Sequence, residues 1–205
     1  MWRAAPLGLL LAACSADPAA EAPNPADAVT IWEERTVVPS PNGSMSLIFD
    51  GGRGLLSAGF LRRSEVGIVE VPSYVLWSPK SDRFYINDSG SASWSRLRVW
   101  NIDARAQPVE VQAISQAAAS ELGRRNGCAH PDETEYMTEG MRWDDDGRRI
   151  YVLAEVRREV NCRFAGVEYI VALIDIHTTE IVAVEQGAAA RRRWPSLPWG
   201  PVTPP

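Results

Sequence analysis

The sequence predicts a mainly β fold, built from antiparallel β-meander units with one inserted α-helix. Three observations support this prediction. A segment of Trp, polar turn, Arg and short apolar strand occurs twice without a gap, at residues 77–86 and 143–152. Several short runs alternate apolar and polar residues, as half-buried strands do. The chain also holds eight Trp, whose large side chains fill β cores and interfaces.

The N-terminal segment is predicted to be an export signal. Residues 1–13 carry one early positive charge, Arg3, and then an apolar run too short to span a bilayer of roughly 30 Å. The run ends in Leu11-Ala-Ala-Cys14, which resembles the lipobox of bacterial lipoproteins. This resemblance implies cleavage before Cys14 and acylation of Cys14, so that lipid chains anchor the protein. The alternative is a plain secretory signal with an incidental Cys14.

The residues after Cys14 suggest a location and a tether. Ser15 follows the cysteine, and by analogy with the sorting rule of Gram-negative bacteria it favours the outer membrane, with the protein facing the periplasm. Residues 14–28 are rich in Ala, Pro, Asp and Glu and cannot bury enough apolar surface to order themselves. We therefore expect a flexible tether at 14–28, a β-rich domain at 29–190 and an Arg/Trp/Pro-rich tail at 191–205.

The first unit of the domain consists of short apolar runs separated by turn residues. A weaker copy of the repeat lies at residues 39–48, where Pro39 replaces the Trp and Asn42-Gly43 supplies a tight-turn signal. Residues 55–60 are ambiguous. The strands predicted for this unit are 29–32, 35–38, 45–49 and 66–71.

The second and third units follow one order of strand, loop, strand, turn and strand. Residues 169–176 form the most apolar run after the N-terminal segment and are predicted to be a central, fully buried strand. Residues 87–93 are predicted to be a polar loop. The other strands predicted for these units are 84–86, 96–102, 108–111, 150–153 and 181–184.

These units resemble the blade repeat of WD-type β-propellers, in particular periplasmic repeats that open with a Trp-Ser-Pro-Asp-Gly-Lys-like segment. The matching residues are 77–79, 99–102 and 143–151. Propellers close with about four to eight blades of four strands, whereas this chain holds at most three units. The resemblance therefore implies either an incomplete, propeller-like stack of sheets or another antiparallel fold made of the same meanders.

One amphipathic helix is predicted at residues 112–125. Ile114, Ala118 and Leu122 are four residues apart and share one helical face. Arg124 and Arg125 suit the negative end of the helix dipole, and Asn-Gly follows as a C-terminal stop. We expect this helix to pack on a sheet. A membrane-surface helix is the alternative, but it would need a long basic stripe on its polar face.

Cys128 and Cys162 are predicted to form a disulfide, because the bacterial envelope is oxidising. The bond would close a loop of about 35 residues and contribute roughly 3–4 kcal/mol in the chain-entropy model. One alternative is a metal site of Cys128, His130 and Cys162, with His177 or a carboxylate as fourth ligand. Its Cys-x-His spacing is unusual for zinc. Free thiols are the other alternative.

No segment identifies a catalytic site or a cofactor. The sequence lacks a nucleophile elbow, a phosphate loop and a dinucleotide fingerprint. The acidic run 144–146 could be a fragment of a calcium loop, but it aligns with the Ser-Pro-Lys-Ser turn of the second unit, which favours a solvated turn. The net charge of −5 argues against nucleic-acid binding, which needs a positive surface.

The C-terminal tail combines an Arg cluster with a Pro-rich segment that carries two Trp. Residues 191–193 are all Arg, and the Pro content after them favours polyproline II or another extended path. Trp194 and Trp199 are expected either to dock on the domain or to reach a partner. In the second case the Arg cluster would meet anionic lipid or sugar phosphate.

Taken together, the sequence predicts a lipid-anchored envelope protein that acts as a non-catalytic interaction or scaffold module for another envelope protein. The alternatives are a periplasmic hydrolase with an acidic site that the sequence does not locate, and a metal-binding envelope protein. Fold alone does not decide among them.

Overall fold

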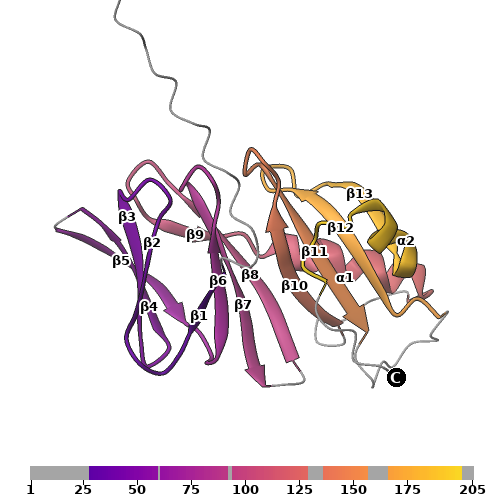
Figure 1. Cartoon of the computed structure of the whole chain (residues 1–205), viewed down its shortest axis with the longest axis horizontal. Coiled ribbons are helices and arrows are strands. Elements are labelled where there is room, and N and C mark those ends of the chain that lie inside the picture. The colour runs from indigo at the N-terminus through magenta and orange to yellow at the C-terminus, as the bar shows by residue number, and fades with distance from the viewer. Residues whose placement is uncertain (1–27, 60, 92–93, 129–135, 157–165, 200–205) are drawn as a thin grey trace, which may run out of the picture.

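The computed structural model describes residues 28–59, 61–91, 94–128, 136–156 and 166–199, and the structural statements below concern these residues (Figure 1). It contains two helices, α1 (Ala113–Arg125) and α2 (Gly187–Arg193). The strands are β1 (Val29–Ile31), β2 (Thr36–Pro39), β3 (Met45–Asp50), β4 (Arg53–Ala58), β5 (Arg62–Ile68), β6 (Ser73–Trp77), β7 (Arg83–Ser91), β8 (Trp94–Ile102), β9 (Pro108–Glu110), β10 (Tyr136–Trp143), β11 (Arg149–Val156), β12 (Tyr169–Asp175) and β13 (Ile181–Gln186).

The strands form three antiparallel sheets. Sheet 1 has the order β2-β3-β4-β5, sheet 2 the order β1-β6-β7-β8-β9, and sheet 3 the order β10-β11-β12-β13. Apart from β1, the strands within each sheet lie side by side in chain order, as in a meander. β1 instead pairs with β6, so the first strand of the domain extends sheet 2. The predicted fold class, mainly β with antiparallel meander units and an inserted helix, is confirmed.

The sheets stack face to face in chain order. One apolar cluster, which includes Phe49 and Trp100, fills the space between sheets 1 and 2. A second, which includes Tyr85 and Ile150, lies between sheets 2 and 3 together with α1. A third joins the outer side of sheet 3 to α2 and the residues that follow it. Figure 1 shows the same order from the indigo strands to the yellow helix.

The three copies of the repeat form the same hairpin turn in the three sheets. The turn joins β2 to β3 in sheet 1, β6 to β7 in sheet 2 and β10 to β11 in sheet 3. In each copy the first turn residue bonds through its N–H to the carbonyl five residues later, at 2.9–3.0 Å, and its side-chain oxygen accepts the N–H of that same residue, at 3.0–3.1 Å. The fourth turn residue has a positive φ of 61–68°. The residues in these three roles are Ser40, Met45 and Gly43; Ser78, Arg83 and Ser81; and Asp144, Arg149 and Gly147.

The Trp of the second and of the third repeat connects its sheet to the preceding one. The Trp77 indole donates to the Val38 carbonyl at 3.2 Å, and the Trp143 indole donates to the Leu76 carbonyl at 3.4 Å. Val38 directly precedes Pro39, which aligns with Trp77. Leu76 directly precedes Trp77, which aligns with Trp143, so the two bonds are equivalent. Pro39 takes the Trp position in sheet 1, and no sheet precedes sheet 1 in the described part of the chain to receive such a bond.

The predicted helix is confirmed as α1. Ile114, Ala118 and Leu122 are fully buried between sheets 2 and 3, and the helix contacts β8, β10, β11 and β12. It ends at Asn126 and Gly127, the latter with φ of +78°. Neither helix in the described part of the chain is long and apolar enough to span a bilayer.

The elements differ from the predictions in five places. The predicted loop 87–93 is wrong in its first part, because β7 continues to Ser91. The strand predicted at 66–71 instead covers Arg62–Ile68, and the Val69 N–H just after it donates to the Gly52 carbonyl at 2.8 Å. Strands β6 and β10 were not predicted. Helix α2 was not predicted either, and it includes the three arginines that begin the predicted tail at 191–205.

Candidate functional site

Most of the cysteine and histidine predictions remain predictions. Cys14, His130 and Cys162 lie outside the described residues. Cys128 is buried just after α1, with its Sγ 3.2 Å from the Tyr136 hydroxyl. Within the described ranges, no group of three or more His, Cys, Asp or Glu side chains is placed to hold a metal ion.

The acidic turn uses its carboxylates to build the hairpin. Asp144 Oδ1 accepts the Arg149 N–H at 3.0 Å, and Asp146 Oδ1 accepts the Arg148 N–H at 2.8 Å. Burial raises the pKa of Asp144, whereas the Arg148 N–H lowers the pKa of Asp146. Asp145 is exposed and pairs with Arg142 at 3.1 Å. These bonds agree with the predicted turn and leave the acids without a calcium-loop arrangement.

His177 belongs to a contact between sheets 2 and 3. Its Nε2 lies 3.0 Å from the guanidinium of Arg83, and its backbone N–H donates to Asp175 Oδ1 at 2.9 Å. Arg83 also donates to the Gly147 carbonyl at 2.9 Å and to Asn101 at 2.9 Å. This network ties the β10–β11 turn to sheet 2, which is a structural role for His177.

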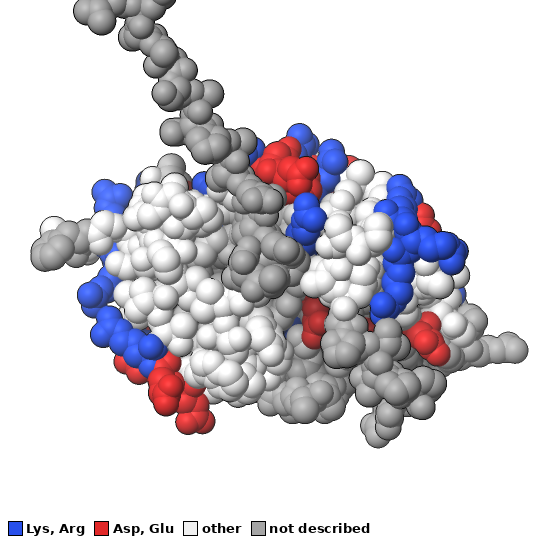
Figure 2. All heavy atoms as spheres, in the orientation of Figure 1, with Lys and Arg blue, Asp and Glu red and all other residues white. Residues whose placement is uncertain are grey.

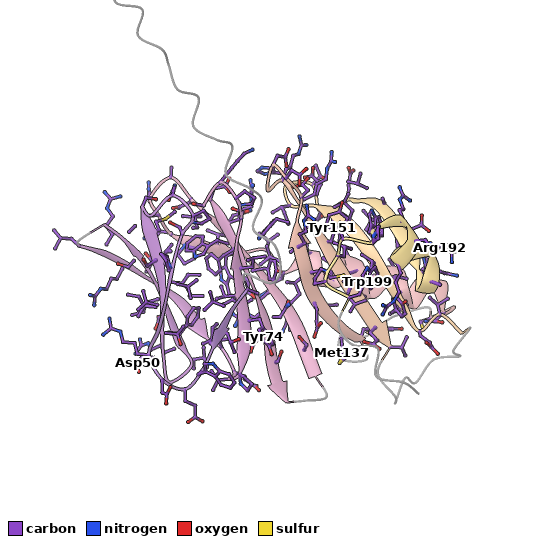
Figure 3. All side chains as sticks on the ribbon, in the orientation of Figure 1. Asp50, Tyr74, Met137, Tyr151, Arg192 and Trp199 are labelled. Atoms are coloured by element: carbon purple, nitrogen blue, oxygen red, sulfur yellow. The ribbon has the colours of Figure 1, made fainter. Side chains whose placement is uncertain are left out.

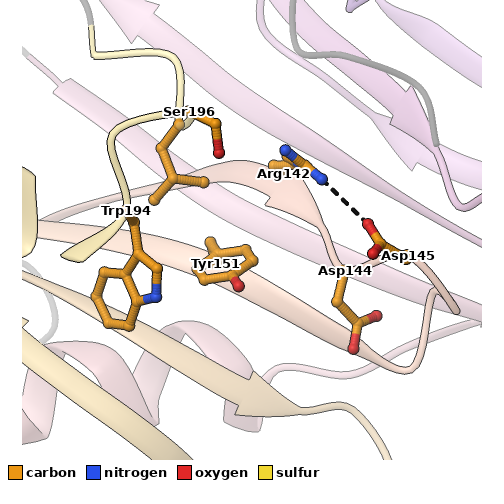
Figure 4. A pocket seen from close by; sticks show the side chains of 7 residues that line it. Arg142, Asp144, Asp145, Tyr151, Trp194 and Ser196 are labelled. Carbon is orange, nitrogen blue, oxygen red and sulfur yellow. Dashed lines mark hydrogen bonds and ion pairs between the residues drawn. The ribbon is translucent and has the colours of Figure 1, made fainter.

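A pocket of about 150 Å³ lies where the β10–β11 hairpin meets the residues after α2 (Figure 4). Arg142 at the end of β10 and Tyr151 in β11 are paired in the sheet. The Trp194 ring meets the Tyr151 ring edge-on, with centroids 5.5 Å apart. The pocket is lined by Arg142, Asp144, Asp145, Tyr151, Trp194, Ser196 and Leu197.

The pocket exists because the tail docks on sheet 3. Leu197 packs against Met141 and Val171, and the Trp199 indole donates to the Trp194 carbonyl at 2.9 Å. Arg191 lies over the Trp199 ring, 4.7 Å from its centroid. Figure 3 shows Tyr151 and Trp199 on the side of sheet 3 that carries α2, with Arg192 at the outer side of that helix. Up to Trp199 the tail therefore follows the docking alternative.

Two arginines of the β10–β11 hairpin, of which Arg142 lines the pocket, have unsatisfied donors. The Nε atoms of Arg142 and Arg149 are buried and have no hydrogen-bond partner among the described residues. A buried donor without a partner costs about 1–3 kcal/mol. Sequence reasoning did not identify Arg142, Tyr151 or Ser196 as pocket residues. Docking of Trp194 and Trp199 on the domain was one of the two alternatives that it gave for the tail.

The outer side of sheet 1 is a second candidate surface, here called the open face. Val37, Ile48 and Leu55 are aligned across β2, β3 and β4, and Val37 is 51% exposed. The polar side chains around this apolar row include an Arg53–Glu65 ion pair. No described element packs on it. Figure 2 shows basic side chains along the outer edge of the sheet and acidic ones at its lower end.

The carboxylates with raised pKa do not gather in the pocket. Burial raises the pKa of Glu139 and of Glu155, and the charges of Glu139 and Glu168 raise the pKa of Glu155 further. Neither Glu139 nor Glu155 lines the pocket, and Asp144, which does, is bonded within its turn. The described residues thus give the hydrolase alternative no located site.

Comparison with known proteins gives one structural similarity. The fold is similar to the β-propeller domain of Myceliophteria thermophila Cps50 (Swd1), with 17% sequence identity and a TM-score of 0.42. The aligned region covers 76% of this chain and 44% of that one, so this chain spans less than half of its neighbour's length. No protein-family model matches the chain, and no curated protein matches it.

Proposed function

We propose that this chain is a lipid-anchored envelope protein that acts as a non-catalytic interaction module, with a protein partner bound on the open face. The observation that carries the proposal is the partly exposed apolar row of Val37, Ile48 and Leu55, which no described element covers. An apolar centre within a polar rim is the usual anatomy of a protein interface.

Comparison of the three repeats supports a binding role for this face. Phe84 and Ile150 point toward the preceding sheet and are fully buried. Ser46 takes their position in sheet 1 and is only partly buried, as expected for a face exposed to water. Ile48, which aligns with Ile86 and Val152, has nonetheless stayed apolar. We interpret this apolar row as the contact region of a partner that binds reversibly.

A matched pair of substitutions tests the partner site. Val37→Asp places a charge in the centre of the open face, whereas Val182→Asp alters a valine of equal exposure, 51%, in β13 of sheet 3. In pull-downs from detergent-solubilised envelopes, Val37→Asp should lose at least about 90% of a partner that Val182→Asp retains, because a buried unpaired charge weakens binding by several kcal/mol. Equal retention by both variants would remove the open face from the proposal.

The anchor is tested separately. The lipobox-like residues 11–14 imply acylation of Cys14. Two or more acyl chains on this residue would anchor the protein stably to the membrane. Cys14→Ser should therefore move the protein from the membrane fraction to the soluble fraction of the envelope. A Cys14→Ser protein that still sediments with membranes would contradict the anchor, and density separation of the membranes would test the outer-membrane location.

A further inference from the structure

The outer side of α2 is basic, and we call it the α2 surface, which consists of residues 191–194 and Trp199. The helix buries Ala190 on sheet 3, whereas Arg192 and Arg193 are exposed. Figure 2 shows basic side chains gathered over this helix, and Figure 3 places Arg192 on its outer side. The whole chain carries a net charge of −5, so the α2 surface is opposite in sign to the molecule.

Two tryptophan rings hold the arginines of this surface. Arg191 lies over the Trp199 ring, 4.7 Å from its centroid, and Arg193 lies over the Trp194 ring at 5.2 Å. Both rings are half-buried against sheet 3, so the guanidinium groups have fixed supports. A ring attracts a guanidinium through its π face and takes up no N–H donor in a conventional hydrogen bond, so the donors stay available for another acceptor.

Most donors of these arginines have no acceptor among the described residues. Arg191 donates through Nε to the Tyr169 hydroxyl at 3.4 Å, and Arg193 pairs with Glu185. In the part of the chain that the structure describes, the terminal amino groups of Arg191 and the whole guanidinium of Arg192 have no bonded acceptor. Exposed guanidinium groups bond water, which anionic oxygens can replace, and phosphate oxygens match the guanidinium fork in pairs.

The carboxylates on the same face of sheet 3 do not neutralise these arginines. Glu155 is paired in the sheet with Tyr169, whose hydroxyl meets the α2 surface. A guanidinium near Glu155 would lower its pKa. Burial and the charges of Glu139 and Glu168 instead raise the pKa of Glu155, so it belongs to a separate acidic group. Within the described ranges, Glu185 is thus the one carboxylate that pairs with the α2 surface.

We propose that the α2 surface docks on an anionic membrane, with Arg191 and Arg192 binding lipid phosphate groups and the two tryptophans lying at the level of the headgroups. Trp side chains favour that level of a bilayer, and basic side chains beside them are attracted to anionic lipid. The proposal rests on the proposed anchor, because three arginines bind weakly and acyl chains at Cys14 would keep the surface close to the membrane. Docking at this end leaves the open face, at the other end of the stack, free for its partner.

Cosedimentation with vesicles tests the surface apart from the anchor, in the full chain with Cys14→Ser. With about 30% phosphatidylglycerol in phosphatidylcholine and about 20 mM salt, about half of the protein should be bound at lipid on the order of 10 mM. Pure phosphatidylcholine gives the background, which includes any contribution of residues 1–13. The excess on anionic vesicles should disappear at about 500 mM salt, because salt screens exposed charges.

Substitutions at Arg192 test whether this surface makes the contact. Arg192→Gln should weaken binding to anionic vesicles about fivefold, which corresponds to about 1 kcal/mol per arginine near an anionic surface. Arg192→Lys keeps the charge and should bind within about twofold of the protein that retains Arg192. Arg62→Gln is the matched control and should leave the affinity unchanged. Arg62 is an exposed arginine of sheet 1 that, like Arg192, has no bonded partner among the described residues.

Three results would overturn the proposal. They are equal binding to neutral and anionic vesicles, equal losses from Arg192→Gln and Arg62→Gln, and release by inorganic phosphate at an ionic strength where chloride has no effect. The last result would assign the surface to a free phosphate group. Failure of the anchor is a different result, because Cys14→Ser would then sediment with cell membranes even at about 500 mM salt, where contact through the α2 surface is lost.

Discussion

At the scale of single residues, one position of the repeat shows that hydrogen-bonding geometry matters more than side-chain type. Ser40, Ser78 and Asp144 each place an oxygen where it accepts the N–H five residues later. A hydroxyl and a carboxylate serve this purpose equally well, because both are acceptors. The run of acids at 144–146 is thus a variant of a serine turn.

Removing this oxygen should destabilise the fold. Ser78 Oγ accepts the buried Arg83 N–H at 3.1 Å and donates to Asp82 at 2.9 Å. Ser78→Ala removes the side-chain oxygen that accepts the Arg83 N–H. We expect a loss of about 1–2 kcal/mol in the free energy of unfolding. Urea denaturation measures it. Ser44→Ala, at an exposed turn position, is the control, and an equal loss in both variants would contradict the prediction.

Glu139 should make stability depend on pH. Burial raises its pKa, although a hydrogen bond with Ser95 opposes the shift. Because the folded-state pKa lies above the unfolded one, the folded protein binds more protons between the two values, and stability falls as pH rises through that window. Glu139→Gln should therefore melt at a higher temperature than the wild type at pH 7 and lose this advantage near pH 4.

Thermal melts across this pH range, with exposed Glu180→Gln as control, would check the prediction. An unchanged difference between Glu139→Gln and the wild type from pH 4 to pH 7 would show that Glu139 does not titrate in the expected way. Glu155 lies on the neighbouring strand and its pKa is also raised, so Glu155→Gln should change the pH profile in the same direction.

At the scale of elements, the hairpin turns set the spacing between sheets. Gly43 and Gly147 occupy equivalent turn positions, each with φ of 68°. Alanine in this left-handed conformation costs about 1–2 kcal/mol at either position. At Gly147 the new Cβ would also lie 3.2 Å from Pro79 and 3.3 Å from Ser78, whereas at Gly43 it would meet nothing within 4 Å.

We therefore expect Gly147→Ala to lower the unfolding free energy by about 1 kcal/mol more than Gly43→Ala does, because the neighbouring turn must move. Urea unfolding of the two variants gives both numbers, and their difference isolates the contact between sheets 2 and 3. If the two losses were equal, the β10–β11 turn would not be tightly packed on sheet 2.

The elements that could be predicted are those whose own sequence carries a period. Helix α1 repeats Ile114, Ala118 and Leu122 on one face, and β12 is one apolar run. Strand β10 could not be recognised, because Gly140 interrupts it. That glycine is required by packing from another sheet, since a Cβ there would lie 2.9 Å from the Tyr85 ring.

The wrongly predicted loop and the missed helix have similar explanations. Asn87 resembles a loop residue, but its amide donates to the Gly140 carbonyl at 2.9 Å and accepts the Gly140 N–H at 2.7 Å, so it joins two sheets. Helix α2 has no side-chain cap and only seven residues. It is held by burial of Ala190 on sheet 3, a contact that local sequence does not reveal.

At the scale of the whole molecule, the stack has two ends of different kinds. Sheet 1 begins it with Pro39 in the Trp position and with the open face. Sheet 3 ends it under α2 and the tail, which cover Met141 and Val171. The pocket between the β10–β11 hairpin and the tail could not be predicted from sequence, because it joins residues 142–151 to residues 194–197, which are about fifty positions away.

The two ends together should keep the protein from stacking on itself. Without α2 and the tail, the outer side of sheet 3 would expose an apolar surface that includes Leu153, and the open face of a second molecule offers a complementary row at Val37. Heterologous contacts of this kind lead to open assemblies unless their rotation closes a ring. A cap that covers one end removes the pairing, even if the other end stays open.

A variant that ends at Gln186 should therefore associate head to tail. Sedimentation velocity should show a concentration-dependent increase in mass for this variant, and a monomer for the full chain treated in the same way. Adding Val37→Asp to the shortened chain should restore the monomer, because a charge in the row would be buried unpaired at every contact. Adding Val109→Asp should not, since Val109, which is 53% exposed, lies on β9 of sheet 2, outside both surfaces of the contact. If the shortened chain stays monomeric while folded, the tail does not serve to block this contact. If both aspartates act alike, the exposed apolar surface of sheet 3 leads only to unspecific aggregation.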